Sequence, residues 1–189
     1  MDPRGALPHS QSFCFHADAA GYPCLVMKVS AGLLMYRVRE GEVEFLLAHP
    51  GGPFWKNRDN GAWSIPKGEV NEGEDLLEAA KREFEEELGL QPRGAFLPLE
   101  PILQKNGKRV HAFAVRGDCA PDSIRSNTFR IEWPPRSGRY ETHPEVGVQF
   151  FRLPEARQKV NPAQMPLLEE LARKVSDMDP DKTAEKTVE

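Results

Sequence analysis

The sequence has few cysteines and no long apolar run. Its 189 residues include only Cys14, Cys24 and Cys119, and these form no Cys-x-x-Cys pair. An odd number of widely spaced cysteines indicates neither a disulfide framework nor a zinc site, so we expect plain thiols. No segment is apolar over the roughly 20 residues that a membrane-spanning helix needs. We therefore expect no membrane association.

Signals for export and internal repeats are also missing. The N-terminus has no basic segment followed by a continuous apolar one, as a secretory signal would, and this favours a cytoplasmic location. No period of 20 to 50 residues recurs, which excludes solenoids and arrays. Residues 1–26 and 176–189 lack periodicity and are polar, so we predict a poorly structured N-terminal extension and a charged C-terminal tail. One domain, residues 27–175, lies between them.

The charge is unevenly distributed along the chain. The net charge is −4, but residues 68–90 hold nine acidic and two basic residues and hence −7, so the remaining residues sum to +3. A strongly negative element in a mildly positive protein suits a site that binds cations first and an anionic ligand through them. The balance argues against a stable complex with nucleic acid.

Hydrophobic patterning predicts a mixed α/β domain. Turn-like residues 39–42 and the Asn106-Gly107 dipeptide each separate two apolar runs, which predicts two hairpins. We predict strands at residues 28–38, 43–50, 62–65, 94–104, 108–115 and 146–153, with residues 129–133 extended. Apolar residues at spacings of three predict an amphipathic helix over residues 162–175.

Local signals predict a second helix over residues 75–88, inside the acidic segment. Asp75 is a good N-cap, and Glu78 lies at the capping-box spacing. Gly89 lies where a left-handed residue would end the helix. A stripe of four apolar residues at spacings of four should face the core: Leu76, Ala80, Phe84 and Leu88.

Three glutamates of this helix should share one side. At about 100° per residue, Glu83, Glu86 and Glu87 fall within an arc of about 100°. Such like charges repel unless cations neutralise them, and several hard oxygen ligands suit Mg²⁺ or Mn²⁺. Arg82 lies one turn before Glu86 and can orient a carboxylate, whereas Glu85 points elsewhere. The alternative is a surface helix whose glutamates only confer solubility.

The spacing of the acidic segment is more specific than its composition. The pattern G-x5-E-x7-R-E-U-x-E-E-x-G-U, with U apolar, is met at every position from Gly68 to Leu90. A chance match is on the order of one in a billion per start position. The segment resembles the signature of the Nudix family without departure, and the predicted strand order over residues 28–175 is similar to a Nudix sandwich.

This resemblance implies a fold and a reaction. The fold would be an α/β/α sandwich with a mixed sheet and a loop-helix-loop motif. The implied Mg²⁺ ligands are three glutamates and a backbone carbonyl, namely Glu83, Glu86, Glu87 and the carbonyl of Gly68. Glu74 and Arg82 would hold the loop and these ligands in place. The reaction would be hydrolysis of a phosphorus-containing acid anhydride, namely a nucleoside diphosphate linked to another group. Glu86, Glu87 and Glu145 are the candidates for the general base.

Features that select the substrate are less specific. Lys67 directly precedes Gly68 and is placed to meet a phosphate, although Lys67, Lys56 and Arg58 can equally be ordinary loop residues. The insert before Glu145 interleaves aromatic and basic residues that can stack a base and grip phosphates, among them Trp133, Arg136 and Arg139. It can also be a lid that packs its own aromatic residues.

Four further stretches resemble one bacterial Nudix subgroup, and they read SAGLLMYR, WSIPKGE, EWPPRSGR and VNPAQ. Its members are described as predicted nucleoside-triphosphate pyrophosphohydrolases, near the diadenosine polyphosphate hydrolases. This implies a small-molecule nucleotide as the partner. A non-catalytic nucleotide sensor and an isomerase acting on a diphosphate-bearing isoprenoid precursor are the alternatives. The sequence does not predict the oligomeric state.

Overall fold

The computed structural model of the protein describes residues 28–105, 107–124 and 126–178. The expected N-terminal extension, with Cys14 and Cys24, lies outside these residues. Of the expected C-terminal tail only residues 176–178 are described, and they continue the last helix. Cys119 is a free, half-buried thiol.

Seven strands form one mixed sheet with the order β4-β6-β1-β2-β9. β3 adds to β1 and β5 adds to β6. β1 and β6 are parallel, and the other pairs are antiparallel. The strands are β1 (Val29–Arg39), β2 (Glu42–Pro50), β3 (Lys67–Glu69), β4 (Phe96–Pro98), β5 (Ile102–Leu103), β6 (Arg109–Arg116) and β9 (Val146–Arg152).

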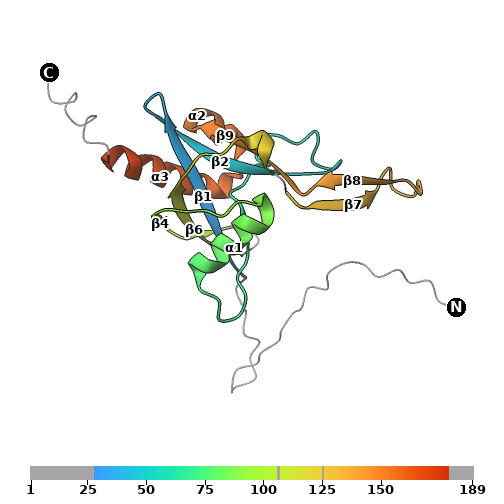
Figure 1. Cartoon of the computed structure of the whole chain (residues 1–189), viewed down its shortest axis with the longest axis horizontal. Helices are drawn as coiled ribbons and strands as arrows, with labels where there is room; N and C mark the ends of the chain where they lie inside the picture. The colour runs from blue at the N-terminus through green and yellow to red at the C-terminus, as the bar shows by residue number, and fades with distance from the viewer. Residues whose placement is uncertain (1–27, 106, 125, 179–189) are drawn as a thin grey trace, which may run out of the picture.

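Helices cover both faces of this sheet (Figure 1). α1 (Leu76–Leu88) packs on one face, while α2 (Leu153–Lys159) and α3 (Met165–Met178) pack on the other. Short 3₁₀ turns at Pro121–Ser123 and Pro162–Gln164 complete the helical elements. The predicted α/β/α sandwich with a mixed sheet is thus confirmed. Within the described ranges, no helix has both the length and the apolar character needed to cross a membrane.

The middle of strand β1, residues 31–35, has no polar side chain and is covered on both faces of the sheet. Leu33 and Met35 face the layer that contains α1, whereas Leu34 faces the layer that contains α2 and α3. All three are buried. Since successive side chains of a strand point to opposite faces, a strand covered on both sides is apolar at most of its buried positions, although β1 also buries Ser30.

Both predicted hairpins are confirmed, because their turn signals are local. β1 pairs with β2 across Glu40 and Gly41, which have φ values of 53° and 74°. β5 pairs with β6 across the segment that contains Gly107. The helix predicted over residues 162–175 is also confirmed, as α3 preceded by a 3₁₀ turn.

The strand predicted at residues 62–65 is wrong. Trp63 and Ser64 form only isolated bridges, with Val160 and Ala48. The regular strand here is β3, three residues further along the chain, where it fills the free edge of β1. Pro66 has no N–H group to donate, so the chain cannot continue one ladder from residue 62 into β3.

The strand predicted over residues 94–104 is divided into β4 and β5, and α2 and β8 were not predicted. α2 follows β9 directly, and β8 (Tyr140–Pro144) pairs with β7 (Thr128–Glu132), the segment expected to be extended. β7 and β8 form a separate two-stranded sheet, which extends beyond the body of the molecule (Figure 1).

Candidate functional site

Both ends of α1 form as the local signals predict. The Asp75 carboxylate accepts hydrogen bonds from the amides of Leu77 and Glu78, at 2.9 and 3.1 Å. Gly89 has a φ of 67°, and its amide donates to the Glu85 carbonyl at 2.8 Å. The helix that carries the acidic residues is therefore fixed at both termini.

The buried side of α1 differs from the prediction in two respects, and the first is that Ala79 is also fully buried. Ala80, Phe84 and Leu88 are fully or almost fully buried, but Leu77 packs in this cluster in place of Leu76. At about 100° per residue, Leu77 lies about 20° from Phe84, whereas Leu76 lies about 80° away. Glu87 falls beside the buried stripe in the same projection, which explains why its side chain is desolvated.

Arg82 connects the loop before α1 to the acidic side of the helix. Its guanidinium donates two hydrogen bonds to Glu74, at 2.8 and 2.9 Å, and one to Glu83 at 2.7 Å. It also reaches the Glu69 carbonyl at 3.0 Å and Glu86 at 3.4 Å. A planar guanidinium that bonds one carboxylate through two donors fixes both groups in orientation.

Glu74 is held ionised by these contacts. The Arg82 guanidinium, helped by the Asn71 amide, lowers the pKa of Glu74 from 4.5 to about 2. Arg82 in turn has its pKa raised, first of all by Glu74. The ion pair between Glu74 and Arg82 thus attaches the loop between β3 and α1 to the helix.

Gly68 leaves room for the Glu83 carboxylate. A Cβ atom at position 68 would lie 1.8 Å from Glu83 Oε2. A side chain at position 68 would therefore displace the Glu83 carboxylate from its place against β3. This contact brings the backbone of β3 against the acidic side of α1.

Glu87 is a desolvated carboxyl group. Burial raises its pKa to about 7, Lys67 opposes this, and the charges of Glu83 and Glu145 add to it. The Lys67 amide donates to Glu87 Oε1 at 3.3 Å. Burial lowers the pKa of the Lys67 ammonium, while the nearby charges of Glu87 and Glu83 oppose that shift. Three carboxylates and one lysine therefore lie within electrostatic reach of each other.

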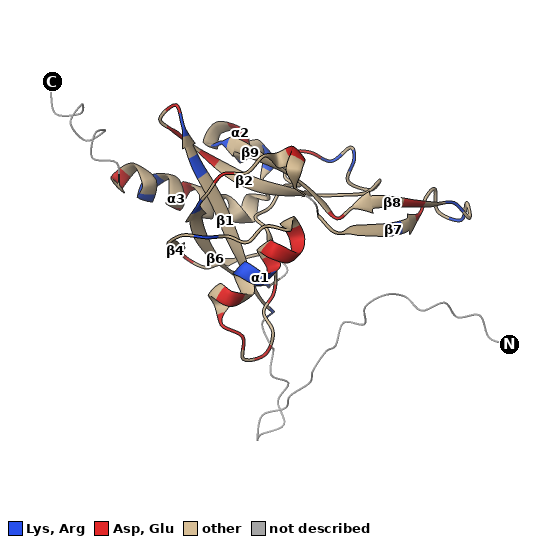
Figure 2. Ribbon diagram, viewed as in Figure 1, with Lys and Arg blue, Asp and Glu red and all other residues tan. Residues whose placement is uncertain are grey.

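The last turn of α1 contains three glutamates, at positions 85 to 87, and no basic residue. Figure 2 shows acidic residues concentrated along the ribbon of α1 and the loop before it. The side chain of Glu86 is 56% exposed, and Glu85 is exposed and accepts a hydrogen bond from Gln91. The C-terminal end of a helix carries partial negative charge, so these carboxylates favour cations in their vicinity.

Glu145 reaches this region from the loop between β8 and β9. Its carbonyl accepts from the Gly51 amide at 2.7 Å, and its amide donates to the Asn127 carbonyl at 2.8 Å. The Asn127 side-chain amide donates to the Glu86 carbonyl at 3.1 Å. Asn127 was not predicted as a site residue, because it lies 41 residues from Glu86 and no local pattern marks it.

The predicted ligands do not form a ready metal-binding group. Over residues 28–105, 107–124 and 126–178, no three His, Cys, Asp or Glu side chains are grouped so that they can hold a metal ion. Glu83 turns towards Arg82, Glu87 lies beside Lys67, and Glu86 points outward. The three glutamates share one side of α1, where Arg82 contacts Glu83 and Glu86, and the Lys67 amide bonds Glu87.

Of the four predicted substrate residues, Lys67 lies in β3 beside Glu87, and the other three lie on the β7–β8 hairpin. Trp133 packs edge-on against Phe54, with ring centroids 5.1 Å apart. Arg136 and Arg139 lie in the turn between the strands, at the end that projects away from α1 (Figures 1 and 2). The base of the hairpin meets the acidic helix through the bond from Asn127 to Glu86.

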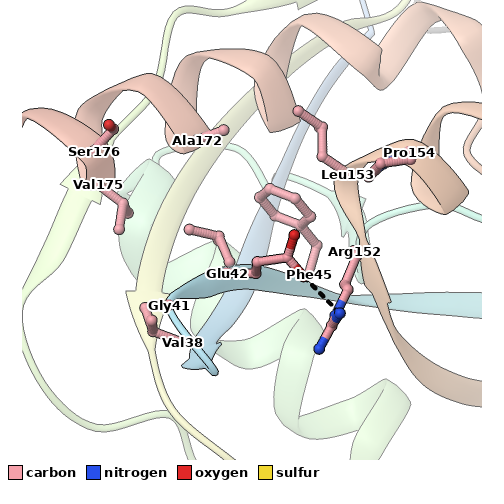
Figure 3. A pocket seen from close by; sticks show the side chains of 11 residues that line it. Val38, Gly41, Glu42, Phe45, Arg152, Leu153, Pro154, Ala172, Val175 and Ser176 are labelled. Carbon is pink, nitrogen blue, oxygen red and sulfur yellow. Dashed lines mark ion pairs between the residues drawn. The ribbon is translucent and has the colours of Figure 1, made fainter. Parts of the chain in front are cut away.

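A separate hollow of about 240 Å³ lies on the other side of the molecule, between the β1–β2 turn, α2 and α3 (Figure 3). Its wall is mainly apolar, with Phe45, Leu153 and Val175 among the lining residues. Arg152 and Glu42 form an ion pair at its rim, with atoms 2.6 Å apart. None of the predicted site residues lines it.

Comparisons with known sequences agree with the motif. A family model described as NUDIX domain matches residues 27–171. The bis(5'-nucleosyl)-tetraphosphatase [asymmetrical] of Caenorhabditis elegans is 41% identical over 61 residues, which is 32% of this chain and 40% of that protein. An octanoyltransferase of Myxococcus xanthus is 28% identical over 128 residues, which is 67% of this chain and 31% of that protein. The matches thus cover well under half the length of these two curated relatives.

Solved structures share the fold. A binary complex of the Caenorhabditis elegans Ap4A hydrolase matches with a TM-score of 0.53 and 25% identity, covering 79% of this chain and 96% of that one. The NUDIX domain of Shewanella oneidensis NrtR, in a complex with ADP ribose, also matches with a TM-score of 0.53. It covers 83% of this chain and 92% of that one, and at 14% identity it bears on the fold alone.

Proposed function

Because the chain belongs to the Nudix family, we propose that it hydrolyses a diphosphate linkage in a nucleoside polyphosphate or dinucleoside polyphosphate, with Mg²⁺ as cofactor. The observation that carries this proposal is the unbroken acidic motif on α1. Its fixed helix holds Glu83 against Gly68 and buries Glu87 next to Lys67. The activity of a phosphoanhydride hydrolase needs such a cluster of oxygen donors opposite a phosphate chain.

The residues present fit a hard divalent cation. The donors are carboxylate and carbonyl oxygens, which Mg²⁺ and Mn²⁺ prefer. The raised pKa of Glu87 reflects a buried negative charge beside Glu83 and Glu145, and a cation would relieve that repulsion. We assign the metal ligands to Glu83, Glu86, Glu87 and the Gly68 carbonyl. Once bound, the cation would neutralise phosphate charge and lower the pKa of a bound water.

Arg82 and Glu74 position these ligands. The paired guanidinium and carboxylate hold the loop before α1 in place, and Arg82 also contacts Glu83 and Glu86. Lys67 lies beside Glu87, where its ammonium can meet a phosphate oxygen of the substrate. Orientation of this kind supplies much of the rate enhancement in phosphoryl transfer.

Glu145 is our choice for the general base. A carboxylate that binds a cation has its charge neutralised and is a weaker proton acceptor, which argues against the helix glutamates in this role. Glu145 comes from a different loop, is exposed, and lies close enough to influence Glu87 electrostatically. It would accept a proton from the attacking water as the new oxygen–phosphorus bond forms and the bond from that phosphorus to the leaving phosphate oxygen breaks.

The substrate class is proposed from chemistry and from relatives. The similar protein of Caenorhabditis elegans is named for a dinucleoside tetraphosphate. In the present chain Trp133, Arg136 and Arg139 provide an aromatic ring and two cations for a base and phosphates, provided that the hairpin bends towards α1.

The test is hydrolysis of a nucleotide panel with and without Mg²⁺. Nucleoside triphosphates, diadenosine polyphosphates, ADP-ribose and NADH should be offered to the purified full chain. We expect Mg²⁺-dependent release of phosphate or nucleoside phosphate from at least one nucleoside or dinucleoside polyphosphate. Nucleotide binding without turnover of any panel member would instead favour a sensor.

Substitutions on α1 make this test specific. Glu86→Gln should lower kcat by at least about a hundredfold, because it removes one charged ligand while keeping the shape of the side chain. Glu85→Gln is the matched control, since Glu85 is exposed on the same turn and bonds Gln91. Full turnover by the Glu86 variant would contradict the assignment of α1 as the catalytic element.

A further inference from the structure

Asn127 bridges two parts of the site through its side chain and its backbone. The side-chain Nδ2 donates to the Glu86 carbonyl at 3.1 Å, and the backbone carbonyl accepts from the Glu145 amide at 2.8 Å. These bonds join the last turn of α1 to the loop before β9. One residue thus contacts both the helix of the proposed metal ligands and the loop of the proposed base.

The bond from Asn127 to the Glu86 carbonyl provides a donor for a carbonyl group in the last turn of α1. The last four carbonyl groups of an α-helix have no amide partner within it. The Glu85 carbonyl receives the Gly89 amide, and the Glu86 carbonyl receives Asn127. The side chain of Asn127 therefore completes the end of α1 from outside the helix.

The loop of Glu145 is held on both of its backbone groups. The Gly51 amide bonds the Glu145 carbonyl at 2.7 Å, and Asn127 bonds its amide. The hydroxyl of Ser126 also accepts from the next amide, that of Val146, at 3.3 Å. Of these contacts, only Asn127 also connects Glu145 to α1.

We propose that Asn127 is a positioning residue, which sets the location of Glu145 relative to Glu86 by bonding the backbone of both. This inference rests on the proposed function. The reacting water must meet the base and the phosphate in one orientation, and a displacement of about 1 Å can cost as much as a hundredfold in rate. Asn127 acts through Glu145, and no contact with the substrate is required of it.

Asn127 is exposed, so its replacement removes little buried surface. Asn127→Leu keeps the size of the side chain, adds no charge near the acidic helix, and removes the donor to Glu86. The backbone carbonyl that bonds Glu145 remains. Asn60→Leu is the matched control, because Asn60 is an exposed asparagine in the loop between β2 and β3.

The experiment measures kcat and KM for the panel nucleotide that the wild-type protein hydrolyses fastest with Mg²⁺. We expect Asn127→Leu to lower kcat about tenfold and to change KM by less than about twofold, as for a group that acts in the transition state. Asn60→Leu should match the wild type. Both variants should keep the thermal midpoint within about 2 °C of the wild type, which separates positioning from loss of fold.

A double-mutant cycle tests the route through Glu145. Glu145→Gln alone should reduce kcat, and adding Asn127→Leu should then cost less than about twofold, because coupled residues are not additive. Multiplied losses, or an Asn127 variant equal to the wild type, would overturn the inference and leave the hydrolase activity standing. A Glu145→Gln variant with the kcat of the wild type would overturn both the inference and the choice of Glu145 as the base. A wild-type protein that hydrolyses no panel member would overturn the proposed function, and the inference with it.

Discussion

The acidic helix α1 and the β7–β8 hairpin meet where Asn127 bonds the Glu86 carbonyl, but they are built differently. α1 is capped at both ends and buries Phe84 and Leu88 in one layer of the core. The hairpin is a sheet of two strands, and its turn projects from the body (Figure 1). We interpret this difference as a division of roles, in which the rigid helix determines the reaction and the projecting hairpin contributes to the choice of substrate.

The charges of the two regions differ in the same sense. The last turn of α1 holds acidic residues without a basic one, whereas the hairpin carries Arg130, Arg136 and Arg139 together with Glu132 and Glu141 (Figure 2). A surface of one sign binds a counter-ion, while a mixed surface with aromatic rings suits a larger polar ligand.

The largest expected difference between the regions is in stability. Phe84→Ala should lower the free energy of unfolding by about 3–5 kcal/mol, since Phe84 is fully buried. Tyr140→Ala in the hairpin should cost less than about 1 kcal/mol, because Tyr140 is 58% exposed and stacks only with Arg130. Urea unfolding measures both values, and equal losses would show that the hairpin is part of the core.

Arg82→Lys should lower kcat by about thirtyfold, or about 2 kcal/mol, while the fold persists. A lysine cannot make the paired bonds to Glu74 and still reach Glu83. Steady-state kinetics and circular dichroism measure the two effects. Lys81→Arg is the control on the same helix, where Lys81 pairs with Glu78 at 2.7 Å. Unchanged turnover of the lysine variant would contradict the positioning role of Arg82.

The Glu74–Arg82 pair should give a defined pH dependence of stability. The folded pKa of Glu74 is lowered to about 2 from 4.5, so its contribution is present above pH 4.5 and disappears as the pH falls through about 2. The stability difference between the wild type and Glu74→Gln should therefore be constant above pH 4.5 and shrink below it. Denaturant titrations from pH 7 to pH 2 measure it, and a difference that grows on acidification would contradict the pairing.

The smallest effect is expected in the hairpin turn. Replacing Arg136 and Arg139 by alanine should raise KM by about threefold and leave kcat unchanged, as for exposed charge contacts with a substrate. Kinetics at two salt concentrations measure this effect, which should weaken at the higher one. A tenfold fall in kcat would show that the hairpin takes part in the chemical step and would break the division of roles.

Sequence reasoning succeeded where the determining interactions are local. Asp75, Gly89 and the turn at Gly107 act within a few residues, so they predicted the caps of α1 and a hairpin. The prediction of Leu76 as a core residue was wrong because periodicity defines a stripe only to within one residue at a helix end. Leu77 is closer to the centre of that stripe.

Contacts between distant segments could not be predicted. The parallel pairing of β1 with β6 and the position of β3 on the edge of β1 depend on which partners are free in the whole sheet. The same holds for the bonds from Asn127 to Glu86 and Glu145, since exposed asparagines have no characteristic spacing. The glutamates of the motif could be identified from the sequence. The residues of other loops that contact them, such as Asn127, could not.

Cation binding by α1 is the central claim, and it can be measured without a substrate. Thermal unfolding of the wild-type protein should be followed as Mg²⁺ or Mn²⁺ is added, beside Glu85→Gln and a variant with glutamine at positions 83, 86 and 87. We expect the cation to raise the thermal midpoint of the wild type and of the Glu85 variant, because binding to the folded state stabilises it, and to leave the midpoint of the triple variant unchanged. An equal rise in all three proteins would contradict the claim that these glutamates hold the metal.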